Sequence, residues 1–347
     1  MKRHVSPSEL YLWLHGLWQR ASLPEGWWLA LWAVLVAAVI LIFVLLTVLV
    51  LIWLERKVSG DIQSRLGPAR VGTRFGLLQT AADALKLLLK EDIIPACADK
   101  PLFVIAPLLV FVPAFMVYIV LPFGRGLVAE NLDLGVLYVI AVSALPALGF
   151  LMAGWGSNNK YSLIGGMRAV AQLMTYEIPL GLAVLTVVMA VGSLSTVAIV
   201  AHQRALWHVA SPPLAVAFVV YFVAALAEVN RIPFDLPEAE AELVAGYHTE
   251  YSGMRWAIFF MGEYAYLFFV SAFAVTLFLG GWHGPFLPPV LWFLIKTYAI
   301  ILVMMWIRWT YPRLRIDQVM RFGWKVLVPV ALINLVAAGF WLVWFAT

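Results

Sequence analysis

The chain has 347 residues, of which 64% are hydrophobic and 12% charged, whereas an ordinary soluble domain is about 25% charged. A chain of this composition cannot cover its surface for water, so most of it is expected to lie in a lipid bilayer. The single cysteine, Cys97, excludes a disulfide framework and an all-thiolate iron–sulfur cluster. The sequence has no G-x-x-x-x-G-K-S/T run, which excludes a P-loop ATPase. The net charge of +4 does not indicate nucleic-acid binding.

Eight apolar runs are each long enough to cross the roughly 30 Å hydrocarbon core of a bilayer as a helix. They cover residues 28–54, 102–122, 134–155, 173–197, 213–230, 257–280, 288–308 and 325–345. The first 27 residues hold Trp13, Trp18 and Trp27 among polar interruptions, which predicts an interfacial lead helix. The pattern therefore predicts an all-α integral membrane protein of eight transmembrane helices, with residues 1–347 forming one membrane domain.

Lysine and arginine in the connections predict the orientation of these spans. The connections after the first, third, fifth and seventh spans carry fifteen of these residues, and the opposite side carries five. Because positive connections stay in the cytoplasm, both termini are expected outside, with residues 55–101 and 231–256 as structured cytoplasmic connections. No internal repeat is visible, which argues against an inverted-repeat transporter.

Within the first cytoplasmic connection, residues 75–90 predict an amphipathic helix. Gln79, Asp83, Lys86 and Lys90 recur at helical spacing and form one polar stripe, while leucine and alanine fill the remaining positions. Such a helix lies in the membrane surface rather than across it.

Several ionisable residues fall where lipid makes a charge costly. Glu177, Glu263 and Lys296 lie inside predicted spans and Glu228 lies in the last turn of one, where a charge costs about 2.5–3.5 kcal/mol on insertion scales. Glu263 and Lys296 lie far from the span ends, so each is expected to pair with the other or with another buried polar group. A static ion pair and water-linked proton transfer both remain open interpretations.

The connection after the fifth span is rich in acids. Asp235, Glu238, Glu240, Glu242 and Glu250 occur there without a lysine or arginine among them. Apolar residues and prolines interleave with these acids, so the loop is expected to pack. Neighbouring carboxylates in a packed loop share protons and titrate together, which suits a proton reservoir.

Five stretches, in order, resemble the membrane-embedded H subunit of respiratory NADH:quinone oxidoreductase, complex I. They are residues 53–72 with Gln79, Asp83, Lys86 and residues 90–92; residues 154–172 with Tyr176 and Glu177; residues 228–240 through Glu250 and Tyr251; residues 262–264; and residues 307–320. The resemblance implies a membrane protein that forms the membrane side of the quinone chamber and docks the peripheral arm. It also implies that quinone reduction is coupled to proton translocation through buried glutamates.

The resemblance also implies residue roles and a setting. The quinone-binding residues would be Arg56, Arg65 and Asp83, with Gln63, Gln79 and Lys86. The proton relay would comprise Glu55, Glu177, Glu228, Asp235, Glu238, Glu240, Glu242, Glu250 and Glu263, with Arg168, Arg231 and Lys296 as counter-charges. No catalytic residue, metal or flavin is expected on this chain, and the quinone, ubiquinone or menaquinone, is the substrate.

The implied partners are the peripheral-arm subunits that carry the terminal iron–sulfur cluster and the quinone-head site, the small and antiporter-like membrane-arm subunits, and the lipid of a bacterial inner membrane. A different interpretation keeps the fold and places it in a membrane-bound hydrogenase or a ferredoxin- or deazaflavin-dependent complex. The pattern also leaves open a secondary cation/proton antiporter, with Glu263 and Lys296 as its ion pair, and a structural anchor for a larger assembly.

Overall fold

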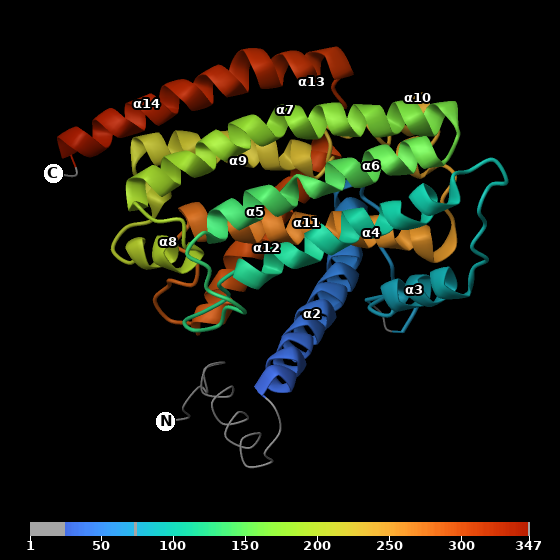
Figure 1. Ribbon diagram of the computed structural model, residues 1–347, viewed down its shortest axis with the longest axis horizontal. Coiled ribbons are helices and arrows are strands. Elements are labelled where there is room, and N and C mark those ends of the chain that lie inside the picture. The colour runs from blue at the N-terminus through green and yellow to red at the C-terminus, as the bar shows by residue number, and fades with distance from the viewer. Residues whose placement is uncertain (1–24, 73–74, 346–347) are drawn as a thin grey trace.

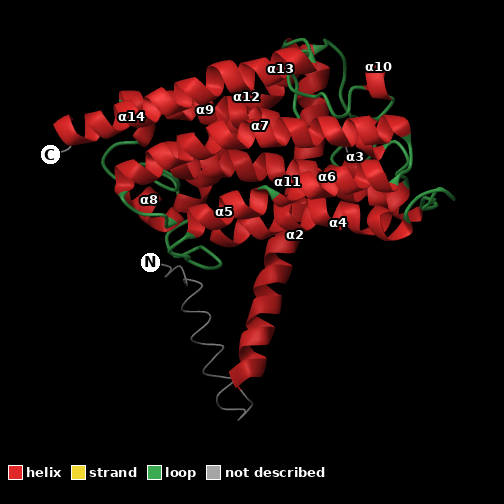
Figure 2. Cartoon of the chain, turned by 45° about the horizontal axis from the view of Figure 1, so that its top comes forward, coloured by secondary structure: helices red, strands yellow, loops and turns green. Residues whose placement is uncertain are grey.

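The computed structural model describes residues 25–72 and 75–345, so nearly all of the predicted lead helix lies outside the described part of the chain. Within that part the protein is all-helical, and the only β-type pairing is an isolated bridge between Gly124 and Leu127. The predicted all-α class is confirmed. Figure 2 shows helices joined by loops in the described part of the chain.

The helices follow one another along the whole chain. The α-helices are α2 (Glu25–Ile62), α3 (Gln79–Leu89), α4 (Lys100–Met116), α5 (Gly135–Ser143), α6 (Leu145–Gly156), α7 (Lys160–Val191), α8 (Thr196–His202), α9 (Pro212–Glu228), α10 (Glu240–Leu243), α11 (Gly253–Phe278), α12 (Pro289–Thr310), α13 (Ile316–Phe322) and α14 (Val328–Phe345). Short 3-10 turns occupy η1 (Val117–Val120), η2 (His208–Ala210) and η3 (Gly246–His248), and a π-helical turn, η4 (Gly323–Leu327), joins α13 to α14.

Seven helical segments among the described residues are long and apolar enough to cross a membrane. The remaining predicted span, residues 213–230, corresponds to α9, an apolar helix of 17 residues. That length is at the lower end of what can cross a bilayer, about 17–25 residues. The protein is therefore a multi-pass membrane protein, and the eighth crossing and the direction of the termini stay predictions.

Helix α11 runs through the centre of the bundle, and α2 leaves the bundle at a steep angle (Figure 1). From Leu267 to Phe278 every side chain of α11 is buried. The hydroxyl of Tyr118 donates a hydrogen bond of 2.7 Å to the carbonyl of Ala265, which ties α11 to the turn after α4. Helix α11 packs against α2, α4, α9 and α12.

Helix α7 begins thirteen residues earlier than the predicted span at residue 173. Asn159 starts it, because its side-chain oxygen accepts a hydrogen bond from the amide of Tyr161 at 2.9 Å. Gly165 and Gly166 lie inside the helix and allow close packing: an added Cβ would come within 2.6 Å of Tyr247 N at Gly165 and 2.7 Å of Phe150 O at Gly166. These glycines serve backbone contact rather than a loop.

The connection after α2 is also shorter than predicted, because α2 continues to Ile62. The amphipathic helix is confirmed but covers only Gln79–Leu89. Its start is delayed because Gly72 and Gly76 adopt φ values of +86° and +67°, which a right-handed helix does not allow. The acid-rich connection between α9 and α11 is called the acidic connection below. It lies near the same end of the bundle as helix α3, opposite α8 (Figure 1).

Candidate functional site

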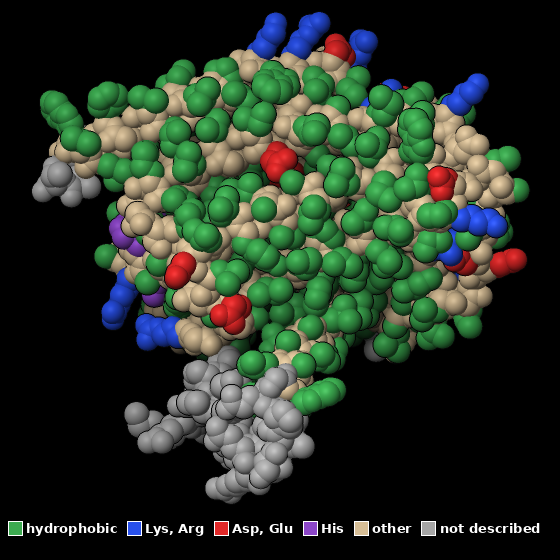
Figure 3. Space-filling model, in the orientation of Figure 1, with side chains coloured by type: hydrophobic (Ala, Val, Ile, Leu, Met, Phe, Trp, Pro, Cys, Tyr) green, Lys and Arg blue, Asp and Glu red, His purple; other side chains and the backbone are tan. Residues whose placement is uncertain are grey.

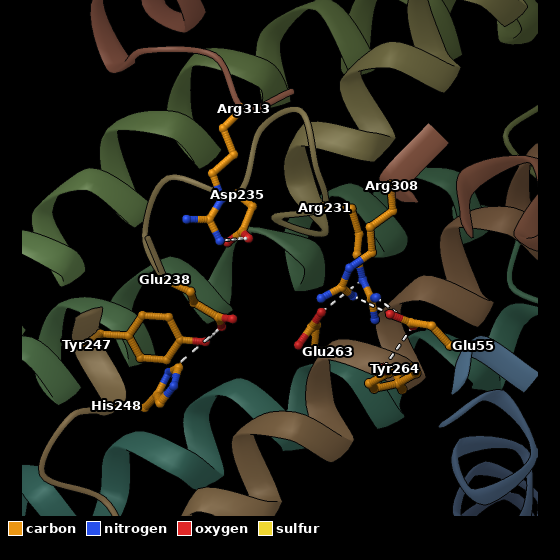
Figure 4. A network of polar contacts seen from close by, with 10 residues as sticks. All are labelled: Glu55, Arg231, Asp235, Glu238, Tyr247, His248, Glu263, Tyr264, Arg308 and Arg313. Carbon is orange, nitrogen blue, oxygen red and sulfur yellow. Dashed lines mark hydrogen bonds and ion pairs between the residues drawn. The ribbon is translucent and has the colours of Figure 1, made fainter. Parts of the chain in front are cut away.

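A buried arginine lies at the centre of the polar network in Figure 4. Arg231 follows α9 and its side chain is 3% exposed. Its Nη1 lies 2.7 Å from Oε2 of Glu55 on α2, and its Nε lies 2.9 Å from Oε1 of Glu263 on α11. The structure therefore brings together three residues that the sequence placed in the proton relay.

Glu55 is paired on both of its oxygens. Arg308, near the end of α12, reaches Oε1 at 2.6 Å, and the hydroxyl of Tyr264 donates to Oε2 at 2.8 Å. Tyr264 also lies under Arg231, with 4.5 Å between the guanidinium carbon and the ring centre. We call Glu55, Arg231, Glu263, Tyr264 and Arg308 the arginine–glutamate cluster, which holds two formal positive and two formal negative charges.

Electrostatics explains why Arg231 keeps its charge in this environment. Burial opposes ionisation, but the carboxylates of Glu263 and Glu55 raise the pKa of Arg231 well above its usual value. A buried charge is tolerated when it is paired and hydrogen-bonded. The cluster therefore holds a permanent positive charge beside two acids.

Gln172 fixes the backbone that carries Arg231. Its side-chain nitrogen lies within hydrogen-bonding distance of the carbonyls of Ala227 and Phe234, at 2.7 and 2.8 Å, and of Asn230 Oδ1 at 3.0 Å. Asn230 adopts a φ of +53°, so the chain turns sharply after α9. The buried amide on α7 thus holds this turn and directs Arg231 into the bundle.

The acidic connection packs beside the cluster, as Figure 4 shows. Asp235 is buried and accepts a hydrogen bond of 2.8 Å from Arg313. Burial and the nearby Glu238 raise the pKa of Asp235 to about 6, although Arg313 lowers it. Asp235 is therefore a carboxyl group that changes its charge near neutral pH.

Glu238 has two partners of its own. It accepts a hydrogen bond of 2.7 Å from the hydroxyl of Tyr247, and Nδ1 of His248 lies 3.8 Å away. Burial, followed by the charge of Glu238, raises the pKa of Tyr247 well above its usual value. Tyr247 therefore remains a neutral hydrogen-bond donor to Glu238.

A small cavity lies between the start of α11 and the end of α9. Its volume is about 30 Å³, enough for about two water molecules. Glu228, Glu263, Tyr247 and Tyr266 are among its lining residues, and Tyr266 donates a hydrogen bond of 3.1 Å to Glu228. Glu177 on α7 is half-buried and within electrostatic range of Glu228.

Three of the six predicted quinone-binding residues, Arg56, Gln79 and Asp83, meet where α2 and α3 pack together. Arg56 donates to Asp83, and Gln79 donates to the other oxygen of Asp83 at 3.3 Å. Arg65 and Gln63 bond to each other at 2.6 Å in the exposed turn after α2, apart from that pair. The remaining predicted residue, Lys86, is exposed on α3.

Three of the predicted relay residues tie the start of α7 to the acidic connection. Arg168 pairs with the exposed Glu242 at 2.6 Å, and Asn159 donates a hydrogen bond of 2.6 Å to Glu250. Glu240 is the first residue of α10, and its side chain lies outside the described part of the structure.

Lys296 does not pair with Glu263. Its ammonium group donates to the carbonyls of Leu279, Gly281 and His283 at 2.7, 3.2 and 2.7 Å. Leu279 follows the last residue of α11, about 24 Å along the helix from Glu263 at 1.5 Å per residue. The geometry therefore gives Lys296 the role of a cap at the far end of α11.

Arg308, Arg313, Tyr264 and Tyr266 are network residues that the sequence interpretation did not assign. Arg308 lies in the last turn of a span whose end faces the same side as Glu55, which was the available signal. The tyrosines carried no such signal, because aromatic residues are common throughout the spans. Among the described residues no three potential metal ligands converge.

Comparison with known proteins agrees with the sequence resemblance. The family model described as NADH dehydrogenase matches residues 35–339. The chain is 52% identical over 315 residues to the NADH-quinone oxidoreductase H subunit of Geobacillus kaustophilus. This match covers 90% of this chain and 93% of that relative. It is 54% identical over 285 residues to the corresponding H subunit of Bacillus cytotoxicus, and this match covers 81% of this chain and 85% of that relative. The chain therefore belongs to the family of NADH-quinone oxidoreductase H subunits.

Proposed function

We propose that this chain forms the membrane side of the quinone chamber of a proton-pumping NADH:quinone oxidoreductase and couples quinone reduction to proton translocation. The main support for the proposal is a series of neighbouring acidic side chains that extends from Asp235 and Glu238 in the acidic connection to Glu177 on α7. Asp235 and Glu238 lie within electrostatic range of Glu263, and a water-sized cavity joins Glu263 to Glu228. Glu177 lies beyond Glu228 in the same series.

The surface around α3 suits the entry of a long apolar substrate with a polar head. Leu85, Leu88 and Leu89 expose more than half of their side chains, next to the polar Arg56–Asp83 pair. An isoprenoid tail would contact the leucines, and the quinone head would meet the guanidinium and carboxylate. Electron transfer and the redox cofactors belong to the other chains of the complex.

Quinone reduction creates a demand for protons beside the acidic connection. A unit charge about 6 Å away is worth roughly 3 kcal/mol at an effective dielectric constant near 20, enough to change a carboxyl pKa by about two units. Asp235, with a pKa of about 6, is suited to respond first. Its change of charge is felt at Glu263, which is held by Arg231.

The cavity provides the next step of the relay. Glu228 and Glu263 are both among its lining residues, and no direct hydrogen bond joins them among the described residues. Water in the cavity would connect them. Glu177 is flanked on the surface of α7 by the exposed Met174 and Ile178, so we place the antiporter-like membrane-arm subunits against this face.

The same proposal locates the partners and the membrane. The peripheral-arm subunits would dock where the connections after α2 and α9 lie, at the end of the bundle that holds α3 and α10. The membrane would be the bacterial inner membrane, with that end toward the cytoplasm. A membrane-bound hydrogenase could use the same fold, so the test must measure quinone reduction directly.

The test is quinone reductase activity in native membranes that carry Arg56→Ala, with NADH and a short-chain quinone. Ferricyanide reduction by NADH reports whether the peripheral arm is intact, and Lys57→Ala removes a neighbouring charge that makes no ion pair with α3. We expect Arg56→Ala to lower quinone reduction at least tenfold without loss of ferricyanide reduction. Unchanged quinone reduction in an assembled complex would remove Arg56 from the quinone site and reopen the hydrogenase-type function.

A further inference from the structure

A second cavity lies at the opposite end of the bundle from the acidic connection. Its volume is about 330 Å³, within the range of small-molecule sites. The walls come from the ends of α7 and α14, the start of α9 and the segment between α8 and α9, and they are largely apolar. We call this cavity the distal pocket; its apolar lining includes Ala190, Leu206, Leu214, Ala338, Trp341 and Leu342.

Two histidines form the polar part of the distal pocket. His208 Nδ1 lies 2.7 Å from the carbonyl of Leu277, and His208 Nε2 lies 3.0 Å from Nδ1 of His202. A carbonyl oxygen only accepts hydrogen bonds, so Nδ1 of His208 carries the hydrogen. Burial lowers the pKa of His208, against the opposing effect of the bond to Leu277, so this ring is neutral.

The tautomer of His208 determines how His202 can act. Because Nε2 of the neutral His208 accepts, Nδ1 of His202 donates to it. The other nitrogen of His202, Nε2, has no partner among the described residues, and the side chain is exposed. The exposed Nε2 edge of His202 is therefore available to a polar group of a ligand at the mouth of the pocket.

Exposed charged residues of both signs lie at this end: the acids Glu130 and Asp133 in the connection before α5, and the bases Arg125 and Arg204. Arg204 lies two residues after His202, is exposed, and has no ion-pair partner within the described chain. The pKa of His283 is lowered by burial and also by the nearby positive charges of Arg125, Lys296 and Arg204. The first turn of α9, the positive end of that helix, contains no acid. Figure 3 shows histidine and basic side chains at the left edge, with acidic side chains beside them.

We infer that the distal pocket binds an anionic phospholipid of the leaflet at this end of the bundle. One acyl chain lies between α9 and α14, the headgroup lies beside His202, and Arg204 binds the phosphate. The apolar walls favour a lipid over a free anion, which would leave them in contact with water. Trp207 and Trp341 line the pocket, and tryptophan is enriched where a membrane meets water.

The inference is tested on the whole complex, purified and placed in nanodiscs made of equal parts phosphatidylglycerol and phosphatidylcholine. Native mass spectrometry after gentle delipidation counts the phosphatidylglycerol that stays bound. His202→Ala with Arg204→Gln removes the headgroup contacts, and Ala338→Phe fills the apolar wall while leaving the charges intact. Arg125→Gln is the matched control, because it removes a charge at the same end from the connection before α5, which contributes no residue to the pocket lining, whereas Arg204 lies between the lining residues His202 and Ala205.

We expect both pocket variants to lower the retained phosphatidylglycerol at least tenfold relative to the unaltered complex and the Arg125→Gln control. Ferricyanide reduction by NADH verifies that each variant is assembled. Equal retention in all complexes, or retention of phosphatidylcholine in place of phosphatidylglycerol, would overturn the inference. Displacement of the lipid by inorganic phosphate alone would also overturn it, since the acyl chain would then contribute nothing.

Discussion

Glu55 and Arg231 are 176 positions apart in the chain and form an ion pair of 2.7 Å whose side chains are 6% and 3% exposed. The pair joins the end of α2 to the turn after α9. Arg308 of α12 and Glu263 of α11 add a second partner to each member. Four separate segments thus meet at one set of charges, and the network holds them together.

Replacing Arg231 by methionine is expected to destabilise the protein strongly. The substitution leaves Glu263 buried and removes one of the two cations that hold Glu55, and breaking a buried pair costs about 3–5 kcal/mol. Arg168→Met is the matched control, because its partner Glu242 is 55% exposed, and a surface pair contributes about 0–1 kcal/mol. Thermal inactivation of the purified complex measures both. Equal midpoints for the two variants would contradict the structural role of Arg231.

Replacing Glu263 by glutamine is expected to lower proton-coupled turnover at least tenfold while ferricyanide reduction is kept. The amide nearly matches the carboxylate in shape, so the packing beside Arg231 is kept, but the negative charge 2.9 Å from its Nε is lost. Glu130→Gln, an exposed acid at the other end of the bundle, is the control. Acidification of vesicles per electron transferred measures coupling, and an unchanged ratio and turnover in Glu263→Gln would remove this residue from the relay.

The pKa of Asp235 predicts a pH dependence that Arg313 controls. Asp235 is protonated below its pKa of about 6 and ionised above it, and Arg313 lowers that value by favouring the carboxylate. Removing the cation with Arg313→Met should raise the pKa, so the acid limb of the quinone reductase profile should move to higher pH. Asp235→Asn should abolish that limb. Superimposable profiles for the three proteins would exclude Asp235 as the titrating group.

Much of this site could be predicted from the sequence because its elements are local. The spacing of Gln79 and Asp83 in a helical stripe placed both on one face, and the structure shows that this face meets Arg56 on α2. The cost of a charge in lipid identified Glu263 and predicted a buried partner. The density of acids after α9 likewise identified the acidic connection.

The identities of the partners could not be predicted, because they depend on contacts between segments far apart in the chain. Glu263 pairs with Arg231 rather than Lys296, since a turn held by Gln172 directs the arginine inward. The apolar run placed the start of this span at residue 173, whereas α7 begins at Lys160. Gly165 and Gly166 in the added part of the helix allow two backbones to approach, and only the packed fold shows this contact.

Lys296 offers the sharpest distinction between a structural and a relay role. Its ammonium group donates to three carbonyls after α11 and lies 4.3 Å from the ring centre of Trp207. Lys296→Met should therefore lower the midpoint of thermal inactivation, because buried carbonyls lose their donor and each such loss costs about 1–3 kcal/mol. The number of protons moved per electron in the surviving complex should not change. Lys296→Arg, which keeps the charge and can donate to the same carbonyls, should restore part of the stability. A fall in protons per electron without loss of stability would instead place Lys296 in the relay, and the cap would then be incidental.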